Sequence, residues 1–283
     1  MNRQTGGVLA PLAARHLTSK PSSPLWAKGS PKWPHPFAIQ SAPLSSSSIQ
    51  RSRNISLFGP PGSGKGSYGK HFAKALEIPV VTTSDVLRKL RPDLVDKMAE
   101  GKLVDDKTVG QTILEGLKEM KLNGRGYNLD GFPRTLEQVA LMEDTWPESF
   151  KVQTVVHLEV PEFVCSTKLL GRRGCSNCGK SYNVNGVDQD GWRMPPFLPK
   201  EGQTCESATK EDMVCDYSVK RDDDTPEIVQ ERLKVYHQNA DPILDYIRDN
   251  AVHKEYRLLT LRPYNGFDGL PELVEKLRRE VDR

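Results

Sequence analysis

From residue 54 onwards, short apolar runs alternate with longer stretches in which apolar positions recur at helical spacing. A loop after Gly59 leads into a helix-compatible stretch that extends to Glu77. Strands that alternate with helices are typical of a parallel sheet covered by helices on both faces, so the pattern predicts an α/β fold. The strand-like runs are 54–58, 79–83, 127–130, 152–160 and 256–261. The later helix-like runs are 135–146, 161–173, 226–250 and 267–281.

One region, residues 174–220, interrupts this alternation. It contains four of the five cysteines and three prolines, and it shows no helical period. We therefore expect a small domain inserted into the α/β core, which a chain of 283 residues is long enough to bury. No apolar run approaches the length of a membrane-spanning helix, so we expect no membrane association.

The first fifty residues differ in composition from the rest. They carry nine serines, seven prolines, five basic residues and no acidic residue. Such a segment buries too little apolar surface to fold, and its composition is typical of an organellar transit peptide. We predict that residues 1–52 are a disordered transit peptide, with an untargeted tail as the alternative. A short amphipathic helix over 8–17 favours a mitochondrial address over a plastid one.

The remaining chain, residues 51–283, has 35 basic and 37 acidic residues. A dedicated nucleic-acid-binding protein usually has a basic domain, so this balance argues against nucleic acid as a partner.

A glycine-rich loop, GPPGSGKGS (59–67), follows the first strand-like run. It satisfies G-x-x-x-x-G-K between a strand and a helix, which is the setting that the motif requires. In such a loop backbone N–H groups and the lysine contact phosphate oxygens, so Lys65 is expected to bind a nucleoside triphosphate. The hydroxyl of the general motif comes one place late, at Ser67, after Gly66.

A second loop follows the strand-like run YNLD (127–130) and reads GFPRT (131–135). Asp130 ends that strand. A carboxylate at this edge of a sheet, beside a phosphate loop, suits a contact with Mg²⁺ through water.

Six motifs occur in the order seen in adenylate kinases, and the chain resembles this family over about residues 53–283. They are GPPGSGKGS (59–67), TTSDVLR (82–88), GKLV (101–104), DGFPRT (130–135) with Gln138, LLGRR (169–173) and RDDD (221–224). The resemblance implies a long-form adenylate kinase that catalyses ATP + AMP ⇌ 2 ADP with Mg²⁺. It also implies a core formed by 53–81, 105–173 and 221–283, an acceptor clamp at 82–104 and a closing lid at 174–220.

The resemblance further assigns roles residue by residue. It implies an ATP site formed by Gly62, Ser63, Gly64, Lys65, Gly66, Ser67, Lys168, Arg172 and Tyr182. It implies an AMP site formed by Thr83, Arg88, Lys102, Leu103, Val104, Gly131, Phe132, Pro133, Arg134, Gln138, Arg221 and Arg232. The catalytic charges are then Lys65, Arg134, Arg172, Arg221 and Arg232, while Asp85 and Asp130 contact Mg²⁺ through water.

The chemistry of phosphoryl transfer agrees with this set of residues. The nucleophile is a phosphate oxygen, which is largely ionised near neutral pH because its second pKa is about 6, so no general base is needed. The reaction needs positive charge around the moving phosphoryl and exclusion of water. Gln138 suits adenine because one amide both donates to and accepts from a base edge.

Three other functions stay open at this point. A GTP:AMP phosphotransferase and a kinase for another monophosphate are alternatives within the enzyme class. A non-catalytic, nucleotide-sensing zinc-ribbon protein is the alternative from another class, although a pure binder has no reason to keep the arginine set. The motif set is self-contained, so a monomer is expected.

The cysteines of the inserted region suggest a metal site. Cys175 and Cys178 have the spacing of half a zinc knuckle, whereas nine residues separate Cys205 from Cys215. Four thiolates are able to ligate a structural Zn²⁺ tetrahedrally. The alternatives are that a subset ligates or that the thiols are simply reduced. Cys165 is expected in the core.

Two departures from the family pattern bear on selectivity. Lys168 stands where many members have arginine, and lysine stacks less well on a base than a planar guanidinium does. Between Arg88 and Lys102 lie 13 residues. That is shorter than the usual long form by roughly two helical turns. The acceptor clamp is therefore abbreviated, and we expect weaker selectivity for AMP.

Overall fold

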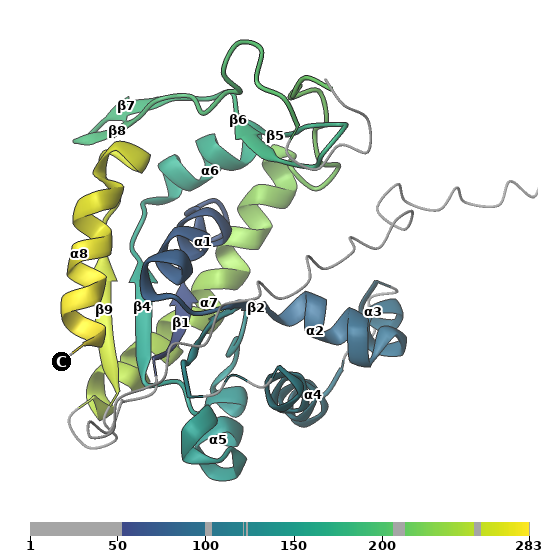
Figure 1. Ribbon diagram of the computed structural model, residues 1–283, viewed down its shortest axis with the longest axis vertical. Coiled ribbons are helices and arrows are strands. Elements are labelled where there is room, and N and C mark those ends of the chain that lie inside the picture. The colour runs from purple at the N-terminus through teal and green to yellow at the C-terminus, as the bar shows by residue number, and fades with distance from the viewer. Residues whose placement is uncertain are drawn as a thin grey trace, which may run out of the picture. The chain divides into compact units, whose positions relative to one another are not determined.

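Five parallel strands form the central sheet of the protein (Figure 1). The structure is a computed structural model that describes residues 53–99, 104–120, 122, 124–205, 213–251 and 256–282. The proposed transit segment, 1–52, lies outside these ranges. The sheet order is β2-β3-β1-β4-β9, so β1 lies at the centre. The strands are β1 (Asn54–Phe58), β2 (Val80–Thr82), β3 (Tyr127–Asp130), β4 (Thr154–Leu158) and β9 (Arg257–Leu261).

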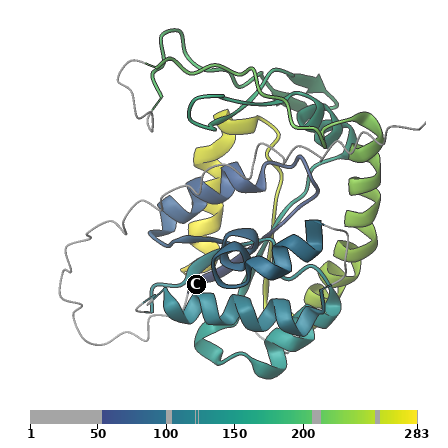
Figure 2. The ribbon, with the colours of Figure 1, turned by 90° about the vertical axis from the view of Figure 1, so that its right-hand side faces the viewer.

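Helices cover both faces of this sheet (Figures 1 and 2). Because side chains alternate along a strand, Val155 and Val156 belong to two different core clusters. One cluster packs the sheet against α1 (Lys65–Leu76) and α8 (Leu270–Val281). The other packs it against α4, α5 and α7, and these helices are α4 (Asp106–Glu119), α5 (Leu136–Thr145) and α7 (Pro226–Asn250). The predicted α/β class with helices on both faces is confirmed.

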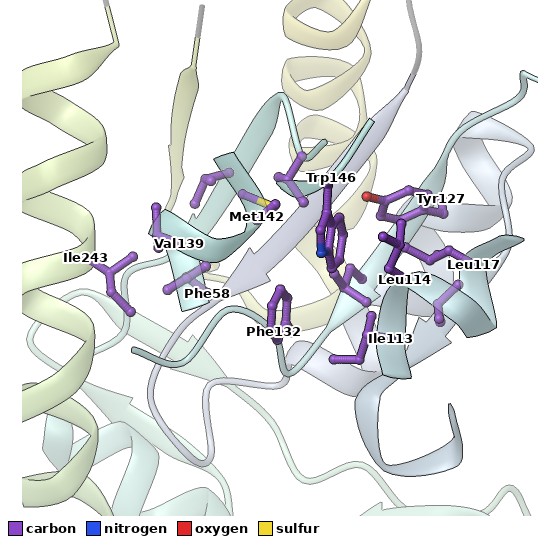
Figure 3. Packing of buried hydrophobic residues seen from close by; sticks show 14 of the residues in the cluster. Phe58, Ile113, Leu114, Leu117, Tyr127, Phe132, Val139, Met142, Trp146 and Ile243 are labelled. Carbon is purple, nitrogen blue, oxygen red and sulfur yellow. The ribbon is translucent and has the colours of Figure 1, made fainter. Parts of the chain in front are cut away.

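The second cluster anchors the loop that follows β3 (Figure 3). Phe132 is 1% exposed and stacks on Trp146, with ring centroids 5.4 Å apart and an interplanar angle of 3°. Trp146 follows α5, so the stack fixes this loop against the end of that helix.

Three helices between β2 and β3 were not predicted from the sequence. They are α2 (Thr83–Leu90), α3 (Pro92–Ala99) and α4. In α4 the buried residues Val109, Ile113 and Leu117 recur every four positions, so the helical signal was present. The predicted strand 79–83 ends at Thr82, because the Thr82 side chain accepts a hydrogen bond from the Asp85 N–H and caps α2.

The other predicted elements differ from the structure mainly at their ends. The helix expected over 161–173 is α6 (Glu162–Leu170), and Arg172 already belongs to strand β5 (Arg172–Gly174). Two short 3₁₀ helices, η2 (Glu148–Phe150) and η3 (Gly266–Gly269), precede β4 and α8. None of the helices in the described ranges is long and apolar enough to cross a membrane.

The region predicted as an inserted domain has two parts. The first part, which we call the cysteine module, holds the four cysteines and pairs β5 with β6 (Ser181–Asn183). The second part is the β7–β8 hairpin, in which β7 (Val187–Gln189) pairs with β8 (Trp192–Met194).

The hairpin packs against the α/β core rather than against the cysteine module. Trp192 and Met194 share a buried cluster with residues of α6 and α7. The Trp192 ring lies 4.7 Å from that of Tyr264, and the Arg193 N–H donates to the Tyr264 carbonyl at 2.7 Å. Within the described part of 174–220, the hairpin therefore packs on the α/β core, whereas the cysteines form a separate cluster.

Candidate active site

The loop that joins β1 to α1 has a backbone that requires glycine. Gly62 and Gly64 have φ angles of 89° and 88°. A Cβ atom at Gly62 would lie 2.4 Å from the carbonyl oxygen of Cys165. Gly64 caps α1 without a side chain, so the first N–H groups of the helix face the loop, as a phosphate site requires.

Lys65 lies at the start of α1 and points back into this loop. Its Nζ donates to the carbonyl oxygens of Gly59 and Pro60 at 2.5 and 3.1 Å. Burial lowers the pKa of Lys65 to about 8, although the nearby charge of Asp130 opposes this shift. The ammonium also lies 6.0 Å from the ring centroid of Tyr236 on α7.

The loop after β3 lies next to the phosphate loop because β1 and β3 are neighbours, with Leu57 opposite Asp130. Two hydroxyl groups fix its backbone. Thr83 Oγ1 donates to the Asp130 carbonyl at 3.1 Å, and Ser56 Oγ donates to the Phe132 carbonyl at 2.8 Å. The Lys65 ammonium and the Asp130 carboxylate therefore sit at adjacent strand ends.

Arg134 folds back over the same loop. Its Nε donates to the Gly131 carbonyl at 2.8 Å. Gly131 has a φ angle of 91°, and a Cβ atom there would lie 2.9 Å from the Arg134 guanidinium. Pro133 follows a cis peptide bond. The geometry leaves the guanidinium exposed at the surface of the loop.

The predicted acceptor residues on α2 lie beside this loop. Thr83 is buried, whereas the Arg88 side chain is 54% exposed. Arg88 donates to Asp85 Oδ1 at 2.7 Å, and Thr82 Oγ1 donates to the other carboxylate oxygen. Val104 packs against the core cluster. The remaining two, Lys102 and Leu103, lie outside the described residues.

Three further arginines surround two aspartates at the start of α7. Asp224 is fully buried and accepts two hydrogen bonds from Arg172, at 2.6 and 2.8 Å. Arg232 donates to Asp223 at 2.9 Å and lies 3.6 Å from Asp224. Burial and the nearby charge of Arg172 lower the pKa of Arg221. Asp224 therefore sets the direction of Arg172 and holds Arg232 close to it.

The two remaining predicted ATP residues make contacts within the protein. Lys168 Nζ donates to the carbonyl oxygens of Asn185 and Met194 at 2.9 and 3.2 Å, which ties α6 to the β7–β8 hairpin. Tyr182 is 2% exposed and packs with the cysteines. Its ring stacks on Phe197, so the structure uses Tyr182 to fill the cysteine module and gives it no open face for a nucleotide.

The four cysteines of the module come together in space. Their Sγ atoms all lie within 4.8 Å of one another. The separations are 3.7 Å for Cys175–Cys205, 3.8 Å for Cys178–Cys215 and 3.5 Å for Cys205–Cys215, and none of the four forms a disulfide. Cys165 is fully buried in the core, as expected.

Comparison with known proteins identifies the family. The sequence model described as "Adenylate kinase" matches residues 57–252. A rice (Oryza sativa subsp. japonica) protein named probable adenylate kinase 6, chloroplastic, is 34% identical over 240 residues, which is 80% of this chain and 76% of that one. The chain belongs to the adenylate kinase family. Adenylate kinase 1, chloroplastic, of Arabidopsis thaliana is 32% identical over 81% of this chain and 79% of that one. The adenylate kinase of Petrotoga mobilis is 34% identical over 69% of this chain and 85% of that one.

Family membership confirms the predicted activity in general terms: this adenylate kinase is a phosphotransferase that acts on ATP and AMP. The relatives give no support to the GTP-dependent, other-monophosphate or non-catalytic alternatives.

Sequence reasoning missed two acidic residues of this adenylate kinase site. Asp224 was part of the RDDD motif but received no role, because its burial is not visible in the sequence. Asp106 starts α4 and accepts hydrogen bonds from Thr135 and Gln138. Asp106 and Gln138 are far apart along the chain, so the sequence alone does not show this contact. The apolar periodicity of α4 would have placed Asp106 at the start of a helix and marked it as a candidate.

Proposed function

We propose that this adenylate kinase moves the γ-phosphoryl group of Mg-bound ATP onto the phosphate of AMP across the adjacent ends of β1 and β3. The observation that carries this proposal is the pairing of those two strands, which sets the phosphate loop beside the loop of Asp130 and Arg134. Both loops have backbones that glycine permits, and hydrogen bonds from Ser56 and Thr83 fix the loop after β3. Two phosphate chains meeting there would lie end to end.

In the proposed mechanism the N–H groups of Gly62 to Ser67 and the Lys65 ammonium hold the ATP phosphates. Lys65 exchanges the Gly59 and Pro60 carbonyls for phosphate oxygens, whose negative charge stabilises the charged form of the lysine. Arg172 and Arg232, directed by Asp224, face the moving group from the other side. These groups stabilise the charge that spreads over the phosphoryl oxygens in the transition state.

The acceptor phosphate is held by Arg88 and Arg134, with Arg221 completing the charge around it. Gln138 contacts the base, and Lys168 holds the β7–β8 hairpin beside the proposed donor site. Asp130, at the strand end beside the phosphate loop, and Asp85, in the first turn of α2, offer carboxylates of the kind that Mg²⁺ binds through water. A bound Mg²⁺ would neutralise part of the negative charge of the ATP phosphates.

The test is ADP formation by the full chain with Mg-ATP and each of AMP, GMP, CMP and UMP, and with GTP in place of ATP. We expect turnover with ATP and AMP, and a loss of at least about a hundredfold in Lys65→Met. Lys70→Met is the matched control, since Lys70 is exposed on the same helix. Equal rates for Lys65→Met and wild type would contradict the proposed role of Lys65.

We also propose a structural zinc ion in the cysteine module. A tetrahedron of thiolates with Zn–S bonds of about 2.3 Å has S–S edges of about 3.8 Å. Three separations of 3.5 to 3.8 Å are close to this edge length, and all four Sγ atoms lie within 4.8 Å of one another. Asp216 supports the module by accepting hydrogen bonds from the Ser176 N–H and hydroxyl, at 2.6 and 2.7 Å.

A plastid location is the third proposal, and it revises the mitochondrial preference of the sequence analysis. The names of the rice relative and of two from Arabidopsis thaliana carry the word chloroplastic. The acid-free, serine-rich residues 1–50 suit transit into either organelle. Import of the full chain into isolated chloroplasts and mitochondria tests the address, with a chain lacking 1–52 as the control. Uptake by mitochondria alone would contradict a plastid address.

A further inference from the structure

Both polar atoms of the Gln138 side chain are bound within the protein. The backbone N–H of Arg134 donates to Oε1 at 2.7 Å, and Nε2 donates to Asp106 Oδ1 at 2.6 Å. A backbone N–H only donates and a carboxylate only accepts, so these two partners permit one orientation of the amide. Rotation by half a turn would set donor against donor and acceptor against acceptor.

Asp106 is itself held in place. Its Oδ2 accepts from Thr135 Oγ1 at 2.7 Å, and that hydroxyl oxygen accepts from the Gln138 N–H at 3.1 Å. Asp106 is the first residue of α4, where the positive end of the helix dipole favours a carboxylate. Gln138, in contrast, lies in the first turn of α5 and is 6% exposed. One carboxylate thus joins the starts of two helices and fixes the amide between them.

We propose that Asp106 is a specificity-determining residue that selects adenine over guanine in the acceptor by fixing the orientation of the Gln138 amide. The inference rests on the proposed function, in which Gln138 contacts the acceptor base. Beyond its two bonds, the amide has one further lone pair on Oε1 and one further N–H on Nε2. Adenine presents a 6-amino donor next to a ring nitrogen acceptor, which this pair of groups matches.

Guanine carries an oxygen acceptor at position 6 in place of the amino group. With the amide fixed, that oxygen faces Oε1, and two acceptors repel. If the amide were free to rotate, it would present an N–H to the guanine oxygen and accept both bases. Selection against guanine therefore depends on what holds the amide, and Asp106 is the side chain that does so.

The alternative is that Asp106 serves only to join α4 and α5. A purely structural residue affects stability and overall rate, but it does not change the preference between two bases. The ratio of kcat/KM for AMP to that for GMP separates the two roles.

The experiment measures this ratio for the full chain at saturating Mg-ATP in wild type, Asp106→Asn, Asp105→Asn and Gln138→Ala. In Asp106→Asn the asparagine amide is able to accept from Nε2 or donate to Oε1 of Gln138, so it no longer selects one orientation. The ratio of kcat/KM for AMP to that for GMP is therefore expected to fall about tenfold. Part of the preference remains, because the Arg134 N–H still favours the original orientation. Asp105→Asn is the matched control: Asp105 caps α4 through Thr108, without a bond to Gln138, and should leave the ratio unchanged.

An unchanged ratio in Asp106→Asn, together with a raised KM for AMP in Gln138→Ala, overturns the inference and leaves the proposed function intact. An unchanged KM for AMP in Gln138→Ala overturns both, because Gln138 then does not contact the base.

Wild-type enzyme gives a test that needs no variant to fold. Inosine monophosphate carries the same oxygen at position 6, whereas purine riboside monophosphate has neither oxygen nor amino group there. A fixed amide predicts that purine riboside monophosphate is the better of these two acceptors. Equal kcat/KM values for the two would overturn the proposal.

Discussion

At the scale of single residues, the proposed site consists of charges that the fold holds partly out of water. Lys65 is buried deeply enough for its pKa to fall to about 8. Asp224 is fully buried and is paired with arginines that reach the surface. Burial strengthens the interaction of such groups with phosphate, and it also makes them sensitive to pH and to the loss of a partner.

The lowered pKa of Lys65 predicts a pH dependence. Lysine is charged below its pKa, so free enzyme should lose its competence to bind ATP phosphates as the pH rises through about 8. We therefore expect kcat/KM for Mg-ATP, which reports the free enzyme, to fall on the alkaline side near that pH. In kcat this fall should move to higher pH, because bound phosphates favour the charged lysine.

Lys65→Arg is the control for this pH dependence. A guanidinium stays charged over the whole range, so the variant should be slower but should lack the fall near pH 8. The same alkaline fall in Lys65→Arg would assign the titration to another group.

Asp224 carries the second prediction at this scale. In Asp224→Asn, one of the two oxygens that accept from Arg172 is replaced by an amide nitrogen, and the negative charge between Arg172 and Arg232 is lost. We expect a loss of about 3 kcal/mol in the free energy of unfolding, as for a broken buried pair. A drop in kcat of about a hundredfold should accompany it, because the arginines no longer point at the phosphoryl group.

Asp223 provides the matched comparison for Asp224. Its side chain is 51% exposed and it makes one bond to Arg232. Asp223→Asn should therefore cost less than about 1 kcal/mol. Chemical denaturation of both variants measures the difference in the free energy of unfolding. Equal losses in the two variants would show that burial does not make Asp224 more important for stability than Asp223.

At the scale of elements, the phosphate loop and α1 form one unit whose glycines have different tasks. Gly62 has a positive φ angle and no space for a Cβ atom, while Gly66 lies in the helix with nothing within 4 Å of the place where a Cβ would be. Gly62→Ala should lose more than about 2 kcal/mol of stability, since backbone strain adds to a clash with a carbonyl group.

Gly66→Ala is the contrasting change in the same unit. Alanine favours a helix over glycine by about 0.5–1 kcal/mol, so this variant should melt at the same temperature as wild type or higher. Thermal unfolding measures both variants. A lower melting temperature for Gly66→Ala would mean that α1 is more crowded than the structure shows.

The element scale also shows what the sequence could and could not reveal. The parallel sheet and the phosphate loop were predictable, because apolar runs and glycine spacing are local signals. The sequence pattern did not lead to a prediction of α2, α3 and α4, although α4 has a regular apolar face. The role of Asp106 depends on a contact with Gln138 over 32 positions, and that of Tyr182 on the burial of one ring among cysteines. Such facts arise from packing and have no signature in a single sequence.

At the scale of the whole molecule, the region between α6 and α7 combines two kinds of stability. The cysteine module has a small buried cluster made of the thiols and Tyr182, which is too little apolar surface to hold it together alone. The β7–β8 hairpin, by contrast, shares a cluster with α6 and α7 and is tied to Lys168 and Tyr264. If the module depends on zinc, the two parts should respond differently when the metal is removed.

The purified full chain should contain one zinc ion, and Cys215→Ser should lose it, whereas Cys165→Ala should keep it because Cys165 lies in the core. Since metal binding is coupled to folding, chelation should raise hydrogen exchange at module amides such as those of Gly174 and Cys175. The amide of Arg193 should stay protected, because its partner is the Tyr264 carbonyl of the core. Metal analysis and hydrogen exchange by mass spectrometry measure both effects. If the Arg193 amide loses protection together with the module amides, the module and the hairpin unfold as one unit. The contacts of the hairpin with the core would then be too weak to keep the hairpin folded.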